Sequence, residues 1–187
     1  MTQKLFEKTS LPNNICVIDD KYISEETTTF YYRPIGNFMT DYHVEDANNN
    51  ELYKHKYNSI TGNSALLDPE TDEKVFEFKS VGHLTKPSEI VITSMKDDKE
   101  IEKITSTEKN EIIEVKTVPL YKECFIYYGR KKENGILICK FSSSKFLFSF
   151  DFKIDIIPGV DTLFILLIII QVFRSNQARN AAIYAAS

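Results

Sequence analysis

The stretch "IDIIPGVDTLFILLIIIQVFRS", residues 154–175, decides how this chain folds. Every residue from 163 to 170 is apolar, and Asp161 lies just before this run. A helix that spans a bilayer needs about 20 predominantly apolar residues, whereas a run of roughly 10 to 14 is more typical of a buried helix. A helix that is hydrophobic all round must be enclosed by the rest of the protein. We therefore predict an enclosed central helix over about residues 162–174.

The residues before the apolar run are interpreted as structural. Pro158 and Gly159 end the preceding strand, and Asp161 occupies the N-cap position of the helix. A ligand site at this helix N-terminus is disfavoured, because the charge of Asp161 opposes a bound anion. The helix is expected to fill the core with residues that include Phe164, Leu166 and Leu167. Two alternatives stay open, a membrane-inserted tail and, because the run is rich in isoleucine, a β-strand.

The rest of the chain has the pattern of short strands. Residues 146–156 alternate strictly between a row of Phe and Ile and a mostly polar row, which is typical of a strand with one buried face. The Asn tract at 48–50 predicts one hairpin turn and residues 69–73 predict another. The apolar residues that begin at Val75 do not alternate perfectly, so that strand is expected to be buried on both faces or bulged. The charged stretch 96–109 is interpreted as a solvated loop or hairpin tip.

These patterns together give the fold class. Roughly ten or more short strands precede a single helix-like segment. Because that helix must be enclosed, we predict a mainly β protein in which a β-barrel surrounds a central helix. The Ala-rich end, residues 176–187, either extends the helix or frays as a tail.

Composition excludes several classes of protein. The net charge is −4 and the pI about 5.5, which argues against a nucleic-acid binder that relies on overall charge. The three cysteines form no CxxC pair, so a disulfide framework is not expected. The N-terminal stretch "MTQKLFEKTSLPNN" has no apolar region of the kind found in secretory signals. These features favour a reducing setting, cytosolic or nuclear, and we predict a cytoplasmic protein that is peripheral at membranes.

No constellation of catalytic or metal-binding residues is visible. His43 and His55 could face each other across the first hairpin, but no Cys/His spacing typical of a metal site surrounds them. Cys124 and Cys139 lie in apolar strand patterns, where a small buried thiol is the usual explanation. Phosphate-binding loops and hydrolase motifs are missing from the sequence. We expect no catalytic residue, no cofactor and no metal.

One basic cluster is a candidate binding site. Three consecutive basic residues lead into a predicted tight turn at residues 133–135, and two more lysines follow on the neighbouring strands. Such a cluster could bind the phosphate groups of a lipid headgroup. An ordinary charged hairpin tip is the alternative interpretation. The candidate lipid- or phosphate-binding residues are Arg130, Lys131, Lys132, Lys140 and Lys145.

Four stretches resemble the LURP-one-related family of the tubby C-terminal-like superfamily, which also includes the phospholipid scramblases. They are "VIDDKYISEETTTFYYR", "GNFMTDYHVEDANNNELYKHK", "ALLDPETDEKVFEF" and "FKIDIIPGVDTLFILLIII". The PGVD sequence followed by an apolar helix is the most specific of these. In the hairpin of the second stretch, the chain has Asn49 or Asn50 where the family usually has Gly, and both residue types tolerate left-handed backbone.

The resemblance implies a closed antiparallel barrel of twelve strands around a C-terminal hydrophobic helix. It places a barrel domain at residues 15–175, between an N-terminal extension at 1–14 and a C-terminal tail at 176–187. The implied function is a non-enzymatic binding module that recognises a phosphoinositide, another anionic lipid headgroup or a protein partner at a membrane surface. The alternative is a soluble regulatory or defence-related interaction scaffold without lipid binding. Scramblase-like lipid transfer is disfavoured, because the chain lacks a full-length membrane span, and no nucleic-acid partner is expected.

Overall fold

The structure is a computed structural model that describes most of the chain. The described backbone covers residues 11–35, 41–58, 60–81, 89–94, 99–104, 113–117, 123–143 and 151–185. Side chains are described for residues 11–35, 41–58, 60–78, 113–116, 123–143 and 151–174.

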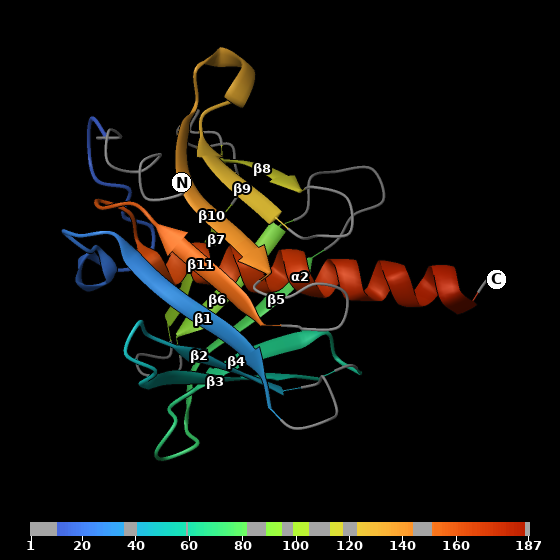
Figure 1. The fold of residues 1–187 in the computed structure, drawn as a ribbon. Coiled ribbons are helices and arrows are strands. Elements are labelled where there is room, and N and C mark those ends of the chain that lie inside the picture. The colour runs from blue at the N-terminus through green and yellow to red at the C-terminus, as the bar shows by residue number, and fades with distance from the viewer. Residues whose placement is uncertain are drawn as a thin grey trace.

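The described residues form one antiparallel sheet of eleven strands and one long helix (Figure 1). The strands lie in the order β7-β6-β5-β4-β3-β2-β1-β11-β10-β9-β8. Their bounds are β1 Thr28–Pro34, β2 Asp41–Glu45, β3 Glu51–Tyr57, β4 Asn63–Leu67, β5 Lys74–Val81, β6 Glu89–Ser94, β7 Lys99–Ile104, β8 Ile113–Thr117, β9 Glu123–Tyr128, β10 Ile136–Ser143 and β11 Phe152–Ile156. Two short 3-10 helices, η1 Asp20–Tyr22 and η3 Lys131–Glu133, and the helix α2 Thr162–Ala185 complete the fold.

The sheet curls around the first half of α2. In Figure 1, β1, β10 and β11 cross in front of the helix while β5 and β6 pass behind it, and the C-terminal half of the helix extends beyond the strands. Every residue from 160 to 171 is buried. The enclosed helix is thereby confirmed and the β-strand alternative is wrong. Within the described part of the chain, no helix has the length and apolarity needed to cross a membrane.

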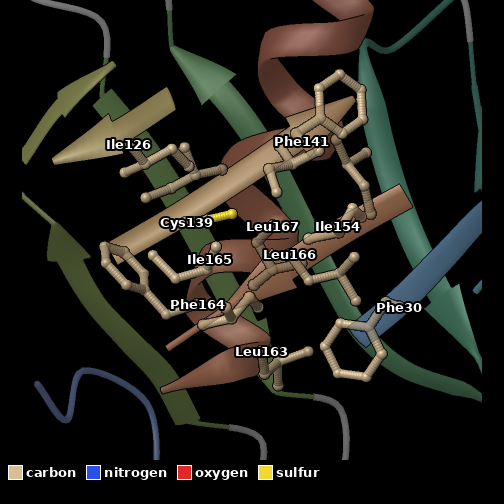
Figure 2. Packing of buried hydrophobic residues seen from close by; sticks show 14 of the residues in the cluster. Phe30, Ile126, Cys139, Phe141, Ile154, Leu163, Phe164, Ile165, Leu166 and Leu167 are labelled. Atoms are coloured by element: carbon tan, nitrogen blue, oxygen red, sulfur yellow. The ribbon is translucent and has the colours of Figure 1, made fainter. Parts of the chain in front are cut away.

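The core forms where alternating strand residues meet this helix (Figure 2). Ile154 of β11 pairs with Phe30 of β1 on one side and with Phe141 of β10 on the other, and all three point inward and are buried. Opposite them, Leu166 and Leu167 of α2 are almost completely buried. Each large apolar side chain that is fully buried stabilises the fold by about 1.5–3 kcal/mol relative to exposure. The predicted core residues Phe164, Leu166 and Leu167 all belong to this cluster.

The twelve strands and the closed barrel are not confirmed. The described residues form eleven strands, and β7 and β8, at the two ends of the strand order, are not paired with each other there. The segment near the N-terminus does not add a strand, because it forms only single bridges, Ile15 with Val160 and Ile23 with Asp161, around η1. Residues 105–112, which connect β7 to β8, lie outside the described part.

Several strand predictions have clear outcomes. Both predicted hairpins form, as β2–β3 and β4–β5. Of the two alternatives for the strand at Val75, burial on both faces or a bulge, the structure shows the bulge, because Leu66 pairs with Phe76 and Leu67 with Lys74, which leaves Val75 as the extra residue. The long alternating stretch forms β11 in its second half, whereas residues 146–150 lie outside the described part.

The structure differs from the predictions in the charged stretch and at the end of the helix. The charged stretch 96–109 contains β7, which pairs with β6 rather than forming only a loop. The helix does not end near residue 174 but continues to Ala185. Its added turns contain several alanines and neither Gly nor Pro, so intrinsic propensity favours continuation. Of the two possibilities for the C-terminal end, extension of the helix is the one that the structure shows.

Asp161 joins the start of α2 to the N-terminal segment, defined here as residues 15–24. Its Oδ1 accepts a hydrogen bond from the backbone N–H of Phe164 at 3.0 Å, which confirms the predicted N-cap. Its Oδ2 accepts from the N–H groups of Val17, Ile18 and Asp19 at 3.2, 2.6 and 3.4 Å. The carboxylate itself is fully buried. One side chain therefore caps the helix and also holds a segment more than 140 residues away in sequence.

The neighbouring residues of the PGVD sequence support the same junction. Gly159 has φ +79, and a Cβ there would lie 3.0 Å from the Oδ1 of Asn14, so glycine suits both the backbone and the space. Its N–H donates to the carbonyl of Ser24 at 2.9 Å. The hydroxyl of Thr162 donates to the carbonyl of Tyr22 at 2.9 Å. The structural role predicted for Gly159 and Asp161 thus rests on direct contacts.

Candidate functional site

The β9–β10 hairpin presents the predicted basic cluster on a rigid tip. The turn begins at Gly129, with φ +80, and ends with Asn134 in the left-handed region at φ 62. The carbonyl of Arg130 accepts the N–H groups of Glu133 and Gly135 at 2.8 and 2.9 Å. A Cβ on Gly135 would lie 2.7 Å from the carbonyl oxygen of Gly129, so only glycine fits this close approach. Figure 1 shows the tip, with η3, projecting away from the rest of the sheet.

Three of the five predicted basic residues lie together on this tip. Arg130 is exposed and lies 3.4 Å from the Oε1 of Glu133. The backbone N–H of Lys131 donates to the Oε2 of Glu114 at 2.8 Å, and its ammonium lies 5.5 Å from the centre of the Tyr127 ring. Lys132 is exposed and has no ion pair among the described residues. These three side chains form what we call the basic tip, residues 130–132.

Lys140 and Lys145 do not join the basic tip. Lys140 lies farther along β10, where it pairs with Phe125 across the strands. Its ammonium lies 2.6 Å from the Oε1 of Glu123, and its side chain is only 19% exposed. Its charge is therefore largely compensated within the sheet. Lys145 lies outside the described residues.

The electrostatics of the basic tip favour an anion. Residues 130–133 carry three positive charges and one negative charge, and the Glu114 carboxylate adds a second negative charge, so the tip keeps a net positive charge of one in a chain whose net charge is −4. The hydrogen bond from the Lys131 N–H, assisted by the nearby Lys116 and Arg130 charges, holds the pKa of Glu114 below its usual value. Glu114 therefore remains ionised and fixes the backbone of the turn. Sequence reasoning missed Glu114, because β8 lies far from the turn in sequence.

The histidines do not form a site. His43 pairs with Lys54 and His55 with Tyr42, so the two histidines are not opposite each other in the β2–β3 ladder. His43 is partly exposed and its Nδ1 lies 2.9 Å from the Oε1 of Glu51. His55 is completely buried. In the described part of the chain, no group of three or more His, Cys, Asp or Glu residues could hold a metal ion.

The buried cysteines are poor candidates for nucleophiles. Cys124 and Cys139 are both buried on the core side of β9 and β10. Burial raises the pKa of Cys124 to about 11 and that of Cys139 well above the ordinary value of a thiol. A thiol rather than a thiolate is therefore present at neutral pH, and the thiolate is the reactive form.

His55 is expected to make the fold sensitive to acid. Its Nδ1 lies 2.8 Å from the Tyr32 hydroxyl, its Nε2 has no partner among the described residues, and burial lowers its pKa to about 3. In the unfolded chain the His55 imidazole takes up a proton near pH 6.5, whereas in the folded protein it does so only near pH 3. The free energy of unfolding is therefore highest above pH 6.5 and declines as the pH falls from there toward 3. We expect His55 to contribute a loss of about 1.4 kcal/mol per pH unit in that window.

Urea unfolding between pH 7 and pH 4.5 measures this dependence. In the variant His55→Phe, the unfolding free energy should fall less steeply with pH than in the parent. The companion variant His43→Phe removes a partly exposed histidine and is the control for the loss of a histidine as such. If the unfolding free energy fell equally steeply with pH in the parent and in His55→Phe, His55 would not be the source of the acid sensitivity.

The comparisons with known proteins identify the family. The sequence model of the LURP-one-related family matches residues 28–173, from the start of β1 to the buried part of α2. The chain belongs to the LURP-one-related family. This LURP-one-related chain is also similar to the crystal structure of a protein from Arabidopsis thaliana, with 18% sequence identity and a TM-score of 0.55. That likeness covers 86% of this chain and 98% of the other, and at this identity it shows the fold alone. No curated protein matches the sequence.

Proposed function

We propose that this LURP-one-related chain is a non-enzymatic, tubby-like binding module that recognises anionic lipid headgroups at the cytoplasmic surface of a membrane. Membership of the family supports the module itself. The observation that carries the lipid assignment is the basic tip, in which three consecutive cations project on a rigid turn of an otherwise acidic protein. Phosphate groups are bound by Arg and Lys through charge-assisted hydrogen bonds, and each cation near an anionic surface contributes about 1 kcal/mol.

The shape of the hairpin supports this proposal. Because the turn is fixed by hydrogen bonds to the Arg130 carbonyl and by Glu114, the cations are presented without a large cost in backbone ordering. The acidic partner of Arg130 does not cancel this role, since an exposed ion pair is worth only about 0–1 kcal/mol and is readily exchanged for a phosphate. Phosphoinositide headgroups, with several phosphates, fit three cations better than a singly charged lipid.

A second candidate function is a regulatory scaffold that binds a protein partner. The observation that favours it is that charged side chains on the outer wall of the sheet are paired with opposite charges. Lys140 pairs with Glu123 there, and Lys153 and Thr29 both contact the Asp155 carboxylate. Such a wall has little net charge and would not attract a membrane by itself.

Flotation with vesicles tests the lipid proposal. The parent should float with vesicles that contain phosphoinositide at low salt and remain in solution with neutral phosphatidylcholine vesicles. Because exposed charges are screened over about 10 Å at 0.1 M salt, binding should weaken as salt is raised. The triple variant Arg130→Glu, Lys131→Glu, Lys132→Glu should lose flotation almost completely, by a factor of at least 100 in affinity on the estimate of about 1 kcal/mol per cation.

A matched control separates the basic tip from total charge. The triple variant Lys54→Glu, Lys56→Glu, Lys74→Glu changes the net charge by the same amount on β3 and β5, away from the tip. It should retain most of the flotation of the parent. If both triple variants lose flotation equally, the tip is not the site. If the parent does not float at low salt, the lipid proposal fails and the scaffold becomes the better account.

A further inference from the structure

A pocket lies between the N-terminal segment and the start of α2, apart from the basic tip. It has a volume of about 370 Å³, at the lower end of the range of about 300–1,000 Å³ that is typical of small-molecule sites. Four parts of the chain line it, namely the N-terminal segment, β1, β3 and the first turns of α2. In Figure 1 the blue N-terminal segment lies beside this end of the helix.

The inner lining of the pocket is apolar. Phe30 of β1 and Leu163 and Leu166 of α2 contribute to it, and all three belong to the buried core. Figure 2 shows Phe30 next to Leu163 at this end of the helix. Apolar walls of this kind accept a hydrocarbon chain, with a gain of about fourfold in affinity per buried methylene.

The polar groups of the pocket are mostly donors, and one is charged. Lys21 is the one charged side chain among the described lining residues. Tyr22 and Tyr53 add two phenol groups, and burial raises the pKa of Tyr53 to about 12, so its hydroxyl remains protonated and able to donate. Lys21 interacts with the Tyr22 side chain, which places the ammonium and a phenol together. An ammonium and phenol groups next to an apolar lining match a molecule with an anionic head and an apolar tail.

The junction at Asp161 holds this arrangement in place. Asp161 binds the backbone of residues 17–19, and Thr162 binds the carbonyl of Tyr22, so the N-terminal segment is fixed over the helix. Lys21 itself is only loosely held. Its ammonium lies 3.1 Å from the Oδ2 of Asp19, with side chains 63% and 45% exposed, and exposed pairs of this kind are easily exchanged.

We propose that this pocket binds a monomeric hydrophobic carboxylic acid, with the carboxylate at Lys21 and the hydrocarbon chain against Phe30 and Leu163. Charge complementarity selects an acid, because Lys21 is the one charged side chain of the described lining, and its partner Asp19, which lies outside the lining, is an exposed carboxylate that an anionic ligand can displace. The pocket is partly open to solvent and its volume of about 370 Å³ suits one medium-length chain, so the ligand we assign to it is a free acid that enters from solution. The site shares no residue with the basic tip and does not depend on the proposed headgroup binding.

Calorimetric titration with decanoate, kept below its micelle concentration and without vesicles, tests the proposal. Decanoate should bind, and octanoate, which is two methylenes shorter, should bind about fifteenfold more weakly. The matching alcohol, 1-decanol, should bind at least tenfold more weakly than decanoate. Failure to bind decanoate, or equal affinity for acid and alcohol, would overturn the assignment.

Two variants change the same contact in opposite directions. Lys21→Gln should weaken decanoate at least tenfold and leave 1-decanol unchanged. Asp19→Asn keeps an oxygen that can accept the Lys21 N–H but removes the competing charge, so decanoate should bind more tightly. Lys54→Gln, a lysine outside the pocket, is the control and should have no effect. Lys21 and Asp19 are both exposed, so the two substitutions should preserve folding, and thermal unfolding checks this. Unchanged decanoate affinity in Lys21→Gln would show that the pocket does not use this cation.

The basic-tip triple variant separates this site from the proposed function. The variant with Arg130→Glu, Lys131→Glu and Lys132→Glu should bind decanoate as the parent does, whether or not it floats with vesicles. Loss of decanoate binding in that variant would place the acid at the basic tip and overturn the pocket assignment.

Discussion

Replacing Asp161 with alanine is expected to lower the unfolding free energy by about 3–5 kcal/mol. The substitution removes the N-cap of α2, a loss of about 0.5–2 kcal/mol. It also removes the acceptor of the N–H groups of Val17, Ile18 and Asp19, which are only partly buried, so each lost hydrogen bond costs about 0.5–1.5 kcal/mol. Typical domains are stable by only about 5–15 kcal/mol, so this change removes a large share of the total.

Asparagine at the same position separates the two roles of the side chain. Its single oxygen can accept from Phe164 or from the N-terminal segment but not from both, because these donors lie on different oxygens of Asp161. Asp161→Asn should therefore lose about half as much stability as the alanine variant. Urea unfolding followed by circular dichroism measures both. Asp72→Ala, which removes an exposed partner of Lys54, should change stability by less than about 1 kcal/mol. A loss below 1 kcal/mol for Asp161→Ala would contradict the proposed junction.

The double role of Asp161 also shows where sequence analysis stops. Its N-cap position follows from residues next to it in the chain, namely the proline and glycine before it and the apolar run after it. Its contact with residues 17–19 cannot be predicted from local spacing, because no periodicity links positions more than 140 residues apart. The enclosed helix was predictable for the same local reason as the cap, since an all-apolar surface admits few other environments.

For the strands too, features that depend on neighbouring residues could be predicted, and features that depend on distant ones could not. Hairpins with clear turn residues, such as the Asn tract, were predicted because the turn determines the pairing. Strand β7, "KEIEKI", was missed because four of its six residues are charged, and composition then favours a loop. Its pairing with β6 has Ile101 opposite Ile92 and Ile104 opposite Ile90. Whether such a short, mostly charged segment forms a strand depends on a neighbouring edge, which is a tertiary property.

The basic cluster was predicted as five residues, and the structure brings three of them together. The consecutive residues 130–132 had to be neighbours, whereas Lys140 could be placed only when the β9–β10 register was known. The acidic partners Glu114 and Glu123 come from other strands and reduce the positive charge in a way that a count along the chain does not show. The same holds for the pocket at Lys21, whose lining comes from four separate parts of the chain.

Leu166→Asp is expected to prevent folding into a soluble, cooperative structure. Leu166 lies on the enclosed part of α2 and is 1% exposed. An isolated carboxylate there would lose its hydration without gaining a partner, at a cost that is far larger than that of a buried neutral polar group. Loss of the apolar side chain alone costs about 2–5 kcal/mol in cores of this kind. The sum approaches the whole stability of a typical domain.

Soluble yield, circular dichroism and urea unfolding measure the outcome. Leu166→Met keeps the volume and apolar character and should cost less than about 1.5 kcal/mol, which shows that the position tolerates a change of shape. Val172→Asp introduces the same charge on the same helix at a position that is only partly buried, so it should be milder. If Leu166→Asp remained soluble and unfolded at the same urea concentration as the parent, α2 could not be enclosed by the sheet. The order Leu166→Met, Val172→Asp, Leu166→Asp, from least to most destabilised, is therefore the signature of an enclosed helix.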